Sequence, residues 1–166
     1  MNKEIKLSNP TMEDAKGIYN LIKNSKPLDL NSQYLYLLQT TYFSDTCIVA
    51  KHEDTVVGFV SGFINPKNKS IFFVWQVAVA SDFRGQGLAF LMLKELFESL
   101  KLSNIKYIHT TISPSNLASQ RTFEKFAQIF EFDKEISIFA TKDDYDNVSE
   151  DELLYMMMPK VNKGIL

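Results

Sequence analysis

The stretch "VAVASDFRGQGLAFL", Val77 to Leu91, runs from an apolar, strand-like segment through a polar loop to the start of a helix. Gly85 and Gly87 in that loop allow a sharp turn and leave backbone N–H groups unobstructed. The first turn of the helix adds a partial positive charge, and Arg84 adds a full one. The stretch therefore predicts a cradle for an anion such as a nucleotide pyrophosphate, and a simple tight turn is the alternative.

Two other phosphate-binding loops do not fit this stretch. A Walker loop requires Gly-Lys-Ser/Thr, and a dinucleotide fingerprint requires Gly-x-Gly-x-x-Gly with an acidic residue downstream. The sequence "RGQGLA" has neither pattern. The ligand of the cradle is therefore not assigned by these motifs.

Length and charge narrow the class of protein. The 166 residues predict one domain, 1–166, and 45% hydrophobic residues predict a packed core. A formal charge of −2 argues against nucleic acid as a partner. The N-terminus lacks the apolar core of a signal peptide, and no apolar run is long enough to span a membrane, so we expect a cytoplasmic protein. The single cysteine, Cys47, stands in an apolar segment and is interpreted as a buried thiol rather than a nucleophile.

The remaining sequence predicts an alternation of strands and helices. Thr11 and Asp14 resemble a capping box before a first helix, Asn31 and Ser32 can cap a second, and Asn116 can cap a fourth. The third helix is expected over 88–100, with an apolar face of Leu88, Leu91, Met92, Leu96 and Leu100. In the fourth helix the apolar residues are Ala118, Phe123, Phe126 and Phe130. Strands are expected at 5–7, 46–50, 56–64, 71–80, 107–112, 135–140 and 153–158, with an acidic surface loop between the last two. Such an order predicts a mixed α/β fold.

The segments "RGQGLA" and "VWQVAVASDF", together with Asn116, resemble the GNAT acetyltransferase superfamily. The resemblance implies an α/β (α+β) fold with a mixed, mostly antiparallel sheet and about four helices. It also implies acetyl-CoA as cosubstrate, with no metal. A strand that splays from its neighbour leaves backbone groups that the pantetheine arm can pair. The residues that the resemblance assigns to the cofactor are Val77, Ala78, Val79, Arg84, Gly85, Gln86, Gly87, Leu88, Ala89, Asn116, Ser119 and Phe123.

Longer segments resemble the diaminobutyrate acetyltransferase family of ectoine biosynthesis. They are "PLDLNSQYLYLL", "FVSGF", "FFVWQVAVASDFRGQGLA" and "HTTISPSNLASQRTFEKFA". This resemblance implies transfer of an acetyl group to the N4 amine of L-2,4-diaminobutanoate and suggests a homodimer. Such a substrate requires carboxylates for its amines and hydrogen-bond donors for its carboxylate.

Five residues are predicted to bind this substrate: Asp29, Tyr34, Trp75, Thr111 and Glu152. Taken alone, Asp29 is typical of a turn, and Tyr34 and Trp75 are typical of a core. Thr111 and His109 alternate with Ile108 and Ile112 and should share one face of their strand.

The catalytic residues are predicted to be Glu152 as general base, Asp29 as an anchor for the amine, and Tyr34 as a hydroxyl donor. The sequence departs from the families' patterns at three positions: Ser149 replaces a histidine, His109 replaces a glutamate, and Phe123 replaces the tyrosine that protonates the thiolate. His109 is therefore a further candidate base.

Two other functions remain open on the sequence alone. The fold could serve a different acceptor, such as another diamine or a protein N-terminus. Alternatively, the departures at Ser149 and Phe123 could mark a non-catalytic acyl-CoA-binding module.

Overall fold

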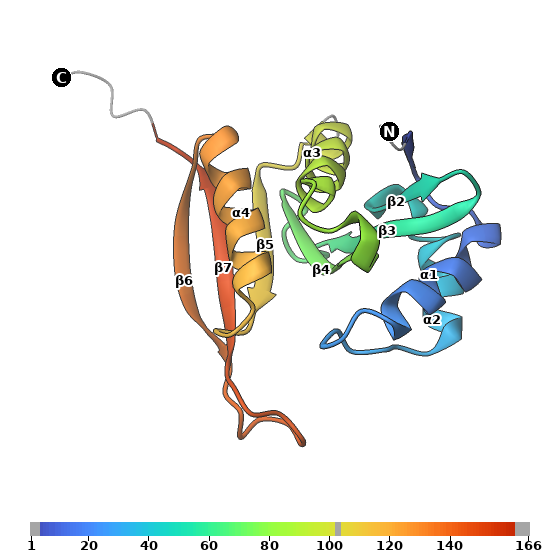
Figure 1. Cartoon of the computed structure of the whole chain (residues 1–166). Helices are drawn as coiled ribbons and strands as arrows, with labels where there is room; N and C mark the ends of the chain where they lie inside the picture. Colours follow the sequence, from blue (N-terminus) through green and yellow to red (C-terminus); the bar gives the residue numbers. More distant parts are fainter. Residues whose placement is uncertain (1–3, 102–103, 162–166) are drawn as a thin grey trace.

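A computed structural model describes residues 4–101 and 104–161 of the chain. In this part of the chain seven strands form one sheet in the order β1-β2-β3-β4-β5-β7-β6 (Figure 1). The parallel pair is β4 with β5, and the other neighbouring pairs are antiparallel, as the resemblance implied. The strands are β1 (Ile5–Ser8), β2 (Cys47–His52), β3 (Thr55–Ile64), β4 (Ile71–Val79), β5 (Tyr107–Ile112), β6 (Phe132–Ala140) and β7 (Glu152–Pro159).

Four α-helices connect these strands within the described residues: α1 (Ala15–Lys23), α2 (Gln33–Gln39), α3 (Leu88–Lys101) and α4 (Leu117–Ile129). The predicted caps at Thr11, Ser32 and Asn116 are confirmed, whereas Asn31 lies outside α2 and does not cap it. Thr11 and Asp14 form a reciprocal capping box before a 3₁₀ turn that leads into α1. The Ser32 hydroxyl accepts from the Leu35 N–H at 3.3 Å, and the Asn116 side chain accepts from the Ser119 N–H at 3.1 Å. Side chains thus satisfy N–H groups that a helix start leaves without partners.

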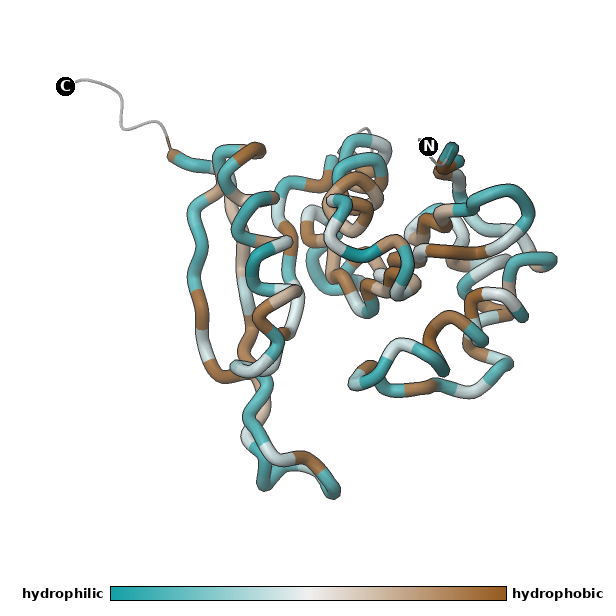
Figure 2. Tube along the Cα trace, in the orientation of Figure 1, coloured by the Kyte–Doolittle hydropathy of each residue, from teal (hydrophilic) through white to brown (hydrophobic). Residues whose placement is uncertain are grey.

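Two hydrophobic cores lie on the two faces of the sheet. One joins α3 and α4 to the sheet and includes Leu96 and Phe126. The other joins α1 and α2 to it through Ile18, Ile22 and Tyr36. Figure 2 shows hydrophobic stretches in the middle of the sheet and along α3, whereas the outer strand β6 has both hydrophilic and hydrophobic residues and the loop between β6 and β7 is mostly hydrophilic. None of the helices in the described part of the chain is long and apolar enough to cross a membrane.

A β-bulge in β4 changes which core the strand contributes to. Ser61 of β3 pairs with Gln76, but the next residue, Gly62, pairs with Val74, so Trp75 is left over. An extra residue shifts the alternation of side chains by one position. Before the bulge, Val74 belongs to the core under α3 and α4, whereas Ala78 after the bulge belongs to the core under α1 and α2.

Some side chains lie elsewhere than the sequence pattern predicts. Leu91 and Ala118 are exposed, because each lies on the outer edge of its helix stripe. The strand predicted at 46–50 is shifted to Cys47–His52, since residues 44–46 form a 3₁₀ turn. Cys47 is confirmed as a buried thiol, and desolvation by burial raises its pKa to about 12.

The close packing around Gly62, at the bulge, can be tested by substitution. A Cβ atom at this position would lie 2.4 Å from both Phe72 Cζ and the Phe73 carbonyl oxygen, and the latter belongs to a backbone that cannot easily move. We expect Gly62→Ala to lower the free energy of unfolding by about 1–3 kcal/mol, measured by urea denaturation.

The neighbouring residue provides the control for this variant. Ser61 is fully buried, and its hydroxyl oxygen has no hydrogen-bond partner among the described residues. Ser61→Ala should therefore leave the stability nearly unchanged or increase it slightly. Equal losses in the two variants would contradict the close approach at Gly62.

Candidate functional site

Strands β4 and β5 separate in the middle of the sheet. Their parallel pairing runs from Ile71 with Tyr107 to Val74 with Thr110 and stops there, although β4 continues to Val79. The Thr110 hydroxyl donates to the Val74 carbonyl at 3.1 Å, at the last pair of the parallel region. Beyond this point one edge of β4 is open toward β5, which is the splay that the family resemblance implied.

The glycine loop follows the open part of β4. Gly85 and Gly87 have φ angles of +73° and +78°, values that favour glycine over residues with a Cβ. The first helical bond of α3 runs from the Leu91 N–H to the Gly87 carbonyl at 3.0 Å, so the N–H groups before Leu91 are free of the α-helical pattern. Arg84 donates from Nε to the Val79 carbonyl at 2.9 Å, which ties the loop to the end of β4.

A pocket of about 470 Å³ opens over this loop. Eleven of the twelve predicted cofactor residues line it: Val77, Ala78, Val79, Arg84, Gly85, Gly87, Leu88, Ala89, Asn116, Ser119 and Phe123. Gln86 does not, because its side chain turns back and donates to the Asp82 carbonyl at 3.2 Å. The structure thus brings together segments from β4, α3 and α4 around one space.

Several residues of this pocket were missed from the sequence. They include Lys26, Arg121 and Lys125, which with Arg84 place four positive charges around it. Arg121 and Lys125 stand four residues apart on α4, so that both lie on one side of the helix. Basic residues on the exposed face of the fourth helix were a signal in the sequence that could have found them. A pocket with this charge suits a phosphorylated ligand.

The predicted acceptor residues come from β4, β5, β7 and the segment from 29 to 34. Tyr34 and Trp75 are 67% and 47% exposed, so the alternative reading of both as core residues is wrong. Asp29 is exposed in the segment between α1 and α2, and its backbone carbonyl accepts from the Gln76 side chain at 2.8 Å. Trp75 is the bulged residue of β4, which accounts for its exposure in the middle of a sheet.

Glu152 begins β7 and is held by a neighbouring loop. The Ser113 hydroxyl, just after β5, donates to Glu152 Oε1 at 2.7 Å, which fixes the direction of the carboxylate. Thr111 and His109 are partly buried and share the face of β5 opposite Ile108 and Ile112, as predicted. Burial lowers the pKa of the His109 imidazole, so the ring is neutral at pH 7. Ser149 lies exposed in the loop before β7.

Tyr145, in the loop between β6 and β7, lies within electrostatic reach of the two predicted carboxylates and was missed from the sequence. Its pKa is raised, first by partial desolvation and then by the negative charges of Glu152 and Asp29. Both carboxylates therefore act electrostatically on one phenol, although they come from opposite ends of the chain. The aromatic residue within the acidic "KDDYDNVSEDE" segment was the available signal.

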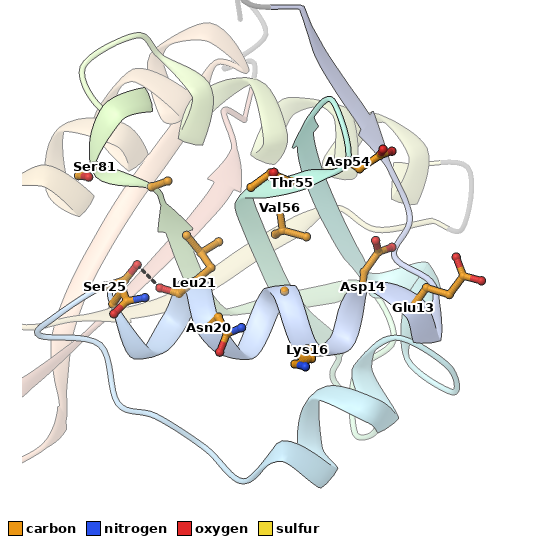
Figure 3. Close-up of a pocket in the computed structure, with 13 residues that line it drawn as sticks. Glu13, Asp14, Lys16, Asn20, Leu21, Ser25, Asp54, Thr55, Val56 and Ser81 are labelled. Atoms are coloured by element: carbon orange, nitrogen blue, oxygen red, sulfur yellow. Dashed lines mark hydrogen bonds between the residues drawn. The ribbon is translucent and has the colours of Figure 1, made fainter.

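A second pocket, of about 640 Å³, lies between α1 and β3 (Figure 3). None of the residues predicted for cofactor or acceptor lines it. Its buried carboxylate, Asp14, is engaged in the fold, since it bonds to the Thr11 N–H and to Lys51 Nζ, both at 2.8 Å. Among residues 4–101 and 104–161, no group of three or more His, Cys, Asp or Glu side chains is arranged to hold a metal ion.

Comparison with known proteins identifies the family. The family model described as "Acetyltransferase (GNAT) family" matches residues 15–127. The L-2,4-diaminobutyric acid acetyltransferase of Marinococcus halophilus is 44% identical over 151 residues, which are 90% of this chain and 87% of that protein. The enzyme of the same name from Virgibacillus pantothenticus is 40% identical over 90% of this chain and 95% of its own length.

A solved structure gives a likeness over nearly the whole chain. It is the diaminobutyrate acetyltransferase of Paenibacillus lautus in complex with its substrate L-2,4-diaminobutyric acid and coenzyme A. The TM-score is 0.91 with 38% identity, covering 98% of this chain and 99% of that one.

The glycine loop can be tested through binding of coenzyme A. At position 87 the present loop requires a left-handed backbone conformation, which costs an alanine about 1–2 kcal/mol. The alanine therefore favours a different loop conformation. We expect Gly87→Ala to weaken coenzyme A binding by about 10-fold or more in calorimetric titrations. Leu91→Ala, an exposed change one turn further along α3, should leave the affinity unchanged, and a loss equal to that of Gly87→Ala would contradict a local role for the loop.

Proposed function

Because the chain belongs to the GNAT acetyltransferase family, we propose that its site transfers an acetyl group from acetyl-CoA to the N4 amine of L-2,4-diaminobutanoate. The observation that carries this proposal is the likeness, across nearly the whole chain, to a diaminobutyrate acetyltransferase with substrate and coenzyme A bound. The product is N4-acetyl-L-2,4-diaminobutanoate, and we infer that it feeds ectoine biosynthesis.

The pocket over the glycine loop fits the donor. Four basic side chains and the start of α3 oppose the charge of the phosphates, and the open edge of β4 offers backbone groups to the pantetheine amides. The thioester then lies along β4, with the Val77 N–H as the proposed hydrogen-bond donor to its carbonyl oxygen. Such a donor stabilises the negative charge that develops on oxygen when the amine attacks.

The acceptor presents a protonation problem. An amine with a pKa near 10 is neutral in only about one molecule in a thousand at pH 7, a handicap of about 4 kcal/mol. We propose that Glu152, oriented by Ser113, accepts the proton as nitrogen forms its bond to the acetyl carbon. Asp29 then serves as the anchor for an ammonium group, and Trp75 and Thr111 contribute to the walls of the acceptor site.

The leaving group also requires a proton. The C–S bond breaks as the tetrahedral carbon collapses, and the thiolate of coenzyme A leaves. Phe123 is buried in the core and has no hydroxyl, so it cannot donate this proton. Tyr34 is the proposed donor at the open end of the site, and the hydroxyl of Tyr145, which feels the charges of Glu152 and Asp29, is a second candidate.

We further propose that the protein acts in the cytoplasm, where it uses acetyl-CoA, and assembles as a homodimer. The exposed apolar side chains of β6, Ile136, Ile138 and Phe139, support self-association. Sedimentation at several protein concentrations tests this, and a single species with the mass of one chain would contradict it.

An acceptor panel tests the proposed reaction. Wild-type protein is assayed for release of coenzyme A with diaminobutanoate, diaminopropionate, ornithine, lysine and a short peptide, and the acetylated nitrogen is located by NMR. We expect the highest kcat/KM with diaminobutanoate and acetylation at N4, because the spacing of the two amines must match the two carboxylates. A higher kcat/KM with another diamine or with the peptide would identify that compound as the acceptor in place of diaminobutanoate. Binding of acetyl-CoA without turnover of any acceptor would favour the non-catalytic alternative.

The role of Glu152 can be tested by separating turnover from donor binding. We expect Glu152→Gln to lower kcat by about 10²- to 10⁴-fold, since the amide cannot accept the proton, with the Kd of acetyl-CoA nearly unchanged. Glu135→Gln, an exposed change on the neighbouring strand β6, is the control and should keep full activity. Equal losses of turnover and acetyl-CoA binding would reject Glu152 as the base.

A further inference from the structure

Gln76 is a buried amide whose two ends are both paired. The side chain is 4% exposed, yet its Nε2 donates to the Asp29 carbonyl at 2.8 Å and its Oε1 accepts from the Tyr36 hydroxyl at 3.3 Å. The Tyr36 oxygen accepts in turn from the Asn31 N–H at 3.3 Å. One network therefore holds the backbone on both sides of Leu30, in the segment that carries Asp29.

The bulge at Trp75 directs Gln76 toward this segment. With regular alternation, Gln76 would share the face of Val74, which lies in the core under α3 and α4. The extra residue turns Gln76 to the opposite face, where Tyr36 is fully buried between α1, α2 and the sheet. Tyr36 is fixed there by edge-on contacts with the rings of Tyr19 and Phe59. The network thus joins a buried base in the core to the exposed segment between α1 and α2.

The network connects the two halves of the site through one strand. Gln76 precedes Val77, which lines the cofactor pocket, and follows Trp75, which is exposed at the acceptor opening. The position of Asp29 is therefore set relative to β4, the strand along which the donor lies. Small errors in the alignment of two reactants cause large losses of rate, so a direct tie between these elements has a catalytic consequence.

We propose that Gln76 and Tyr36 are positioning residues that hold the Asp29 segment in register with the acetyl donor on β4. Neither side chain touches the reacting atoms. This proposal rests on the proposed function for its kinetic effect, because Asp29 is there the anchor for an ammonium group of the acceptor. The structural part, that the network fixes residues 29–31, is separately measurable.

The kinetic test compares Gln76→Met and Tyr36→Phe with a matched control. Gln39 on α2 is also a buried glutamine, at 3% exposed, and its Oε1 has no hydrogen-bond partner among the described residues. We expect Gln76→Met to raise the KM for diaminobutanoate about 10- to 100-fold and Tyr36→Phe about 3- to 10-fold, with the Kd of acetyl-CoA unchanged. Gln39→Met should change neither constant. The double variant should be less impaired than the product of the single effects, because both changes break one network.

Hydrogen–deuterium exchange provides a readout that does not depend on the reaction. Peptides that cover residues 27–35 should exchange faster in Gln76→Met and Tyr36→Phe than in wild type and Gln39→Met, while peptides of α3 remain unchanged. If wild type does not acetylate diaminobutanoate, the proposed function fails, and the exchange data still decide whether the network holds the segment. If wild type is active and the two variants keep the wild-type KM and exchange rates, the positioning role is overturned.

The same set of variants distinguishes a loss of folding from a loss of the positioning role. Melting temperatures identify a variant that does not fold, and Tyr36→Phe, which keeps the buried ring, then decides the proposal in place of Gln76→Met. Equal increases in the KM for diaminobutanoate and in the Kd of acetyl-CoA would indicate general disruption of β4 and would also overturn the proposal.

Discussion

The parallel pairing of β4 with β5 ends at Val74 and Thr110, and the rest of the molecule is organised around that limit. A sheet that stayed closed would have no free backbone at its centre, and a sheet that opened without support would leave buried polar groups without partners. Here β4 remains paired with β3 to its end, so one edge stays fixed while the other becomes available. The pocket, the glycine loop and the acceptor opening all lie along this available edge.

Charge is separated along the opening. The end that meets the glycine loop carries Arg84, Arg121 and Lys125, whereas the other end has the carboxylates of Asp29 and Glu152 near the Tyr145 phenol. A chain with a net charge of only −2 thus presents a positive and a negative region within one site. This arrangement matches a reaction between a polyanionic donor and a cationic amino acid, since each reactant meets the charge opposite to its own.

The sequence allowed the prediction of features that depend on neighbouring residues. The order of elements, the caps at Thr11, Ser32 and Asn116, and the glycine loop are confirmed because short-range periodicity and hydrogen bonding determine them. The bulge at Trp75 could not be predicted, since it is defined by the pairing of β4 with β3 rather than by β4 itself. The bond from Gln76 to Asp29 and the proximity of Tyr145 to two distant carboxylates also depend on tertiary folding. The catalytic roles of Glu152, Asp29 and Tyr34 stay predictions.

The burial of Cys47 affects how such a protein is handled in the laboratory. It is the only cysteine in the sequence, it has no exposed surface, and its thiol is protonated throughout the range in which proteins are usually studied. A chromogenic disulfide added to the folded protein therefore has no sulfhydryl of the protein within reach. In a continuous assay the colour therefore reports only the coenzyme A that turnover releases, because the protein thiol adds no background. The reagent also does not inactivate the enzyme by modifying Cys47.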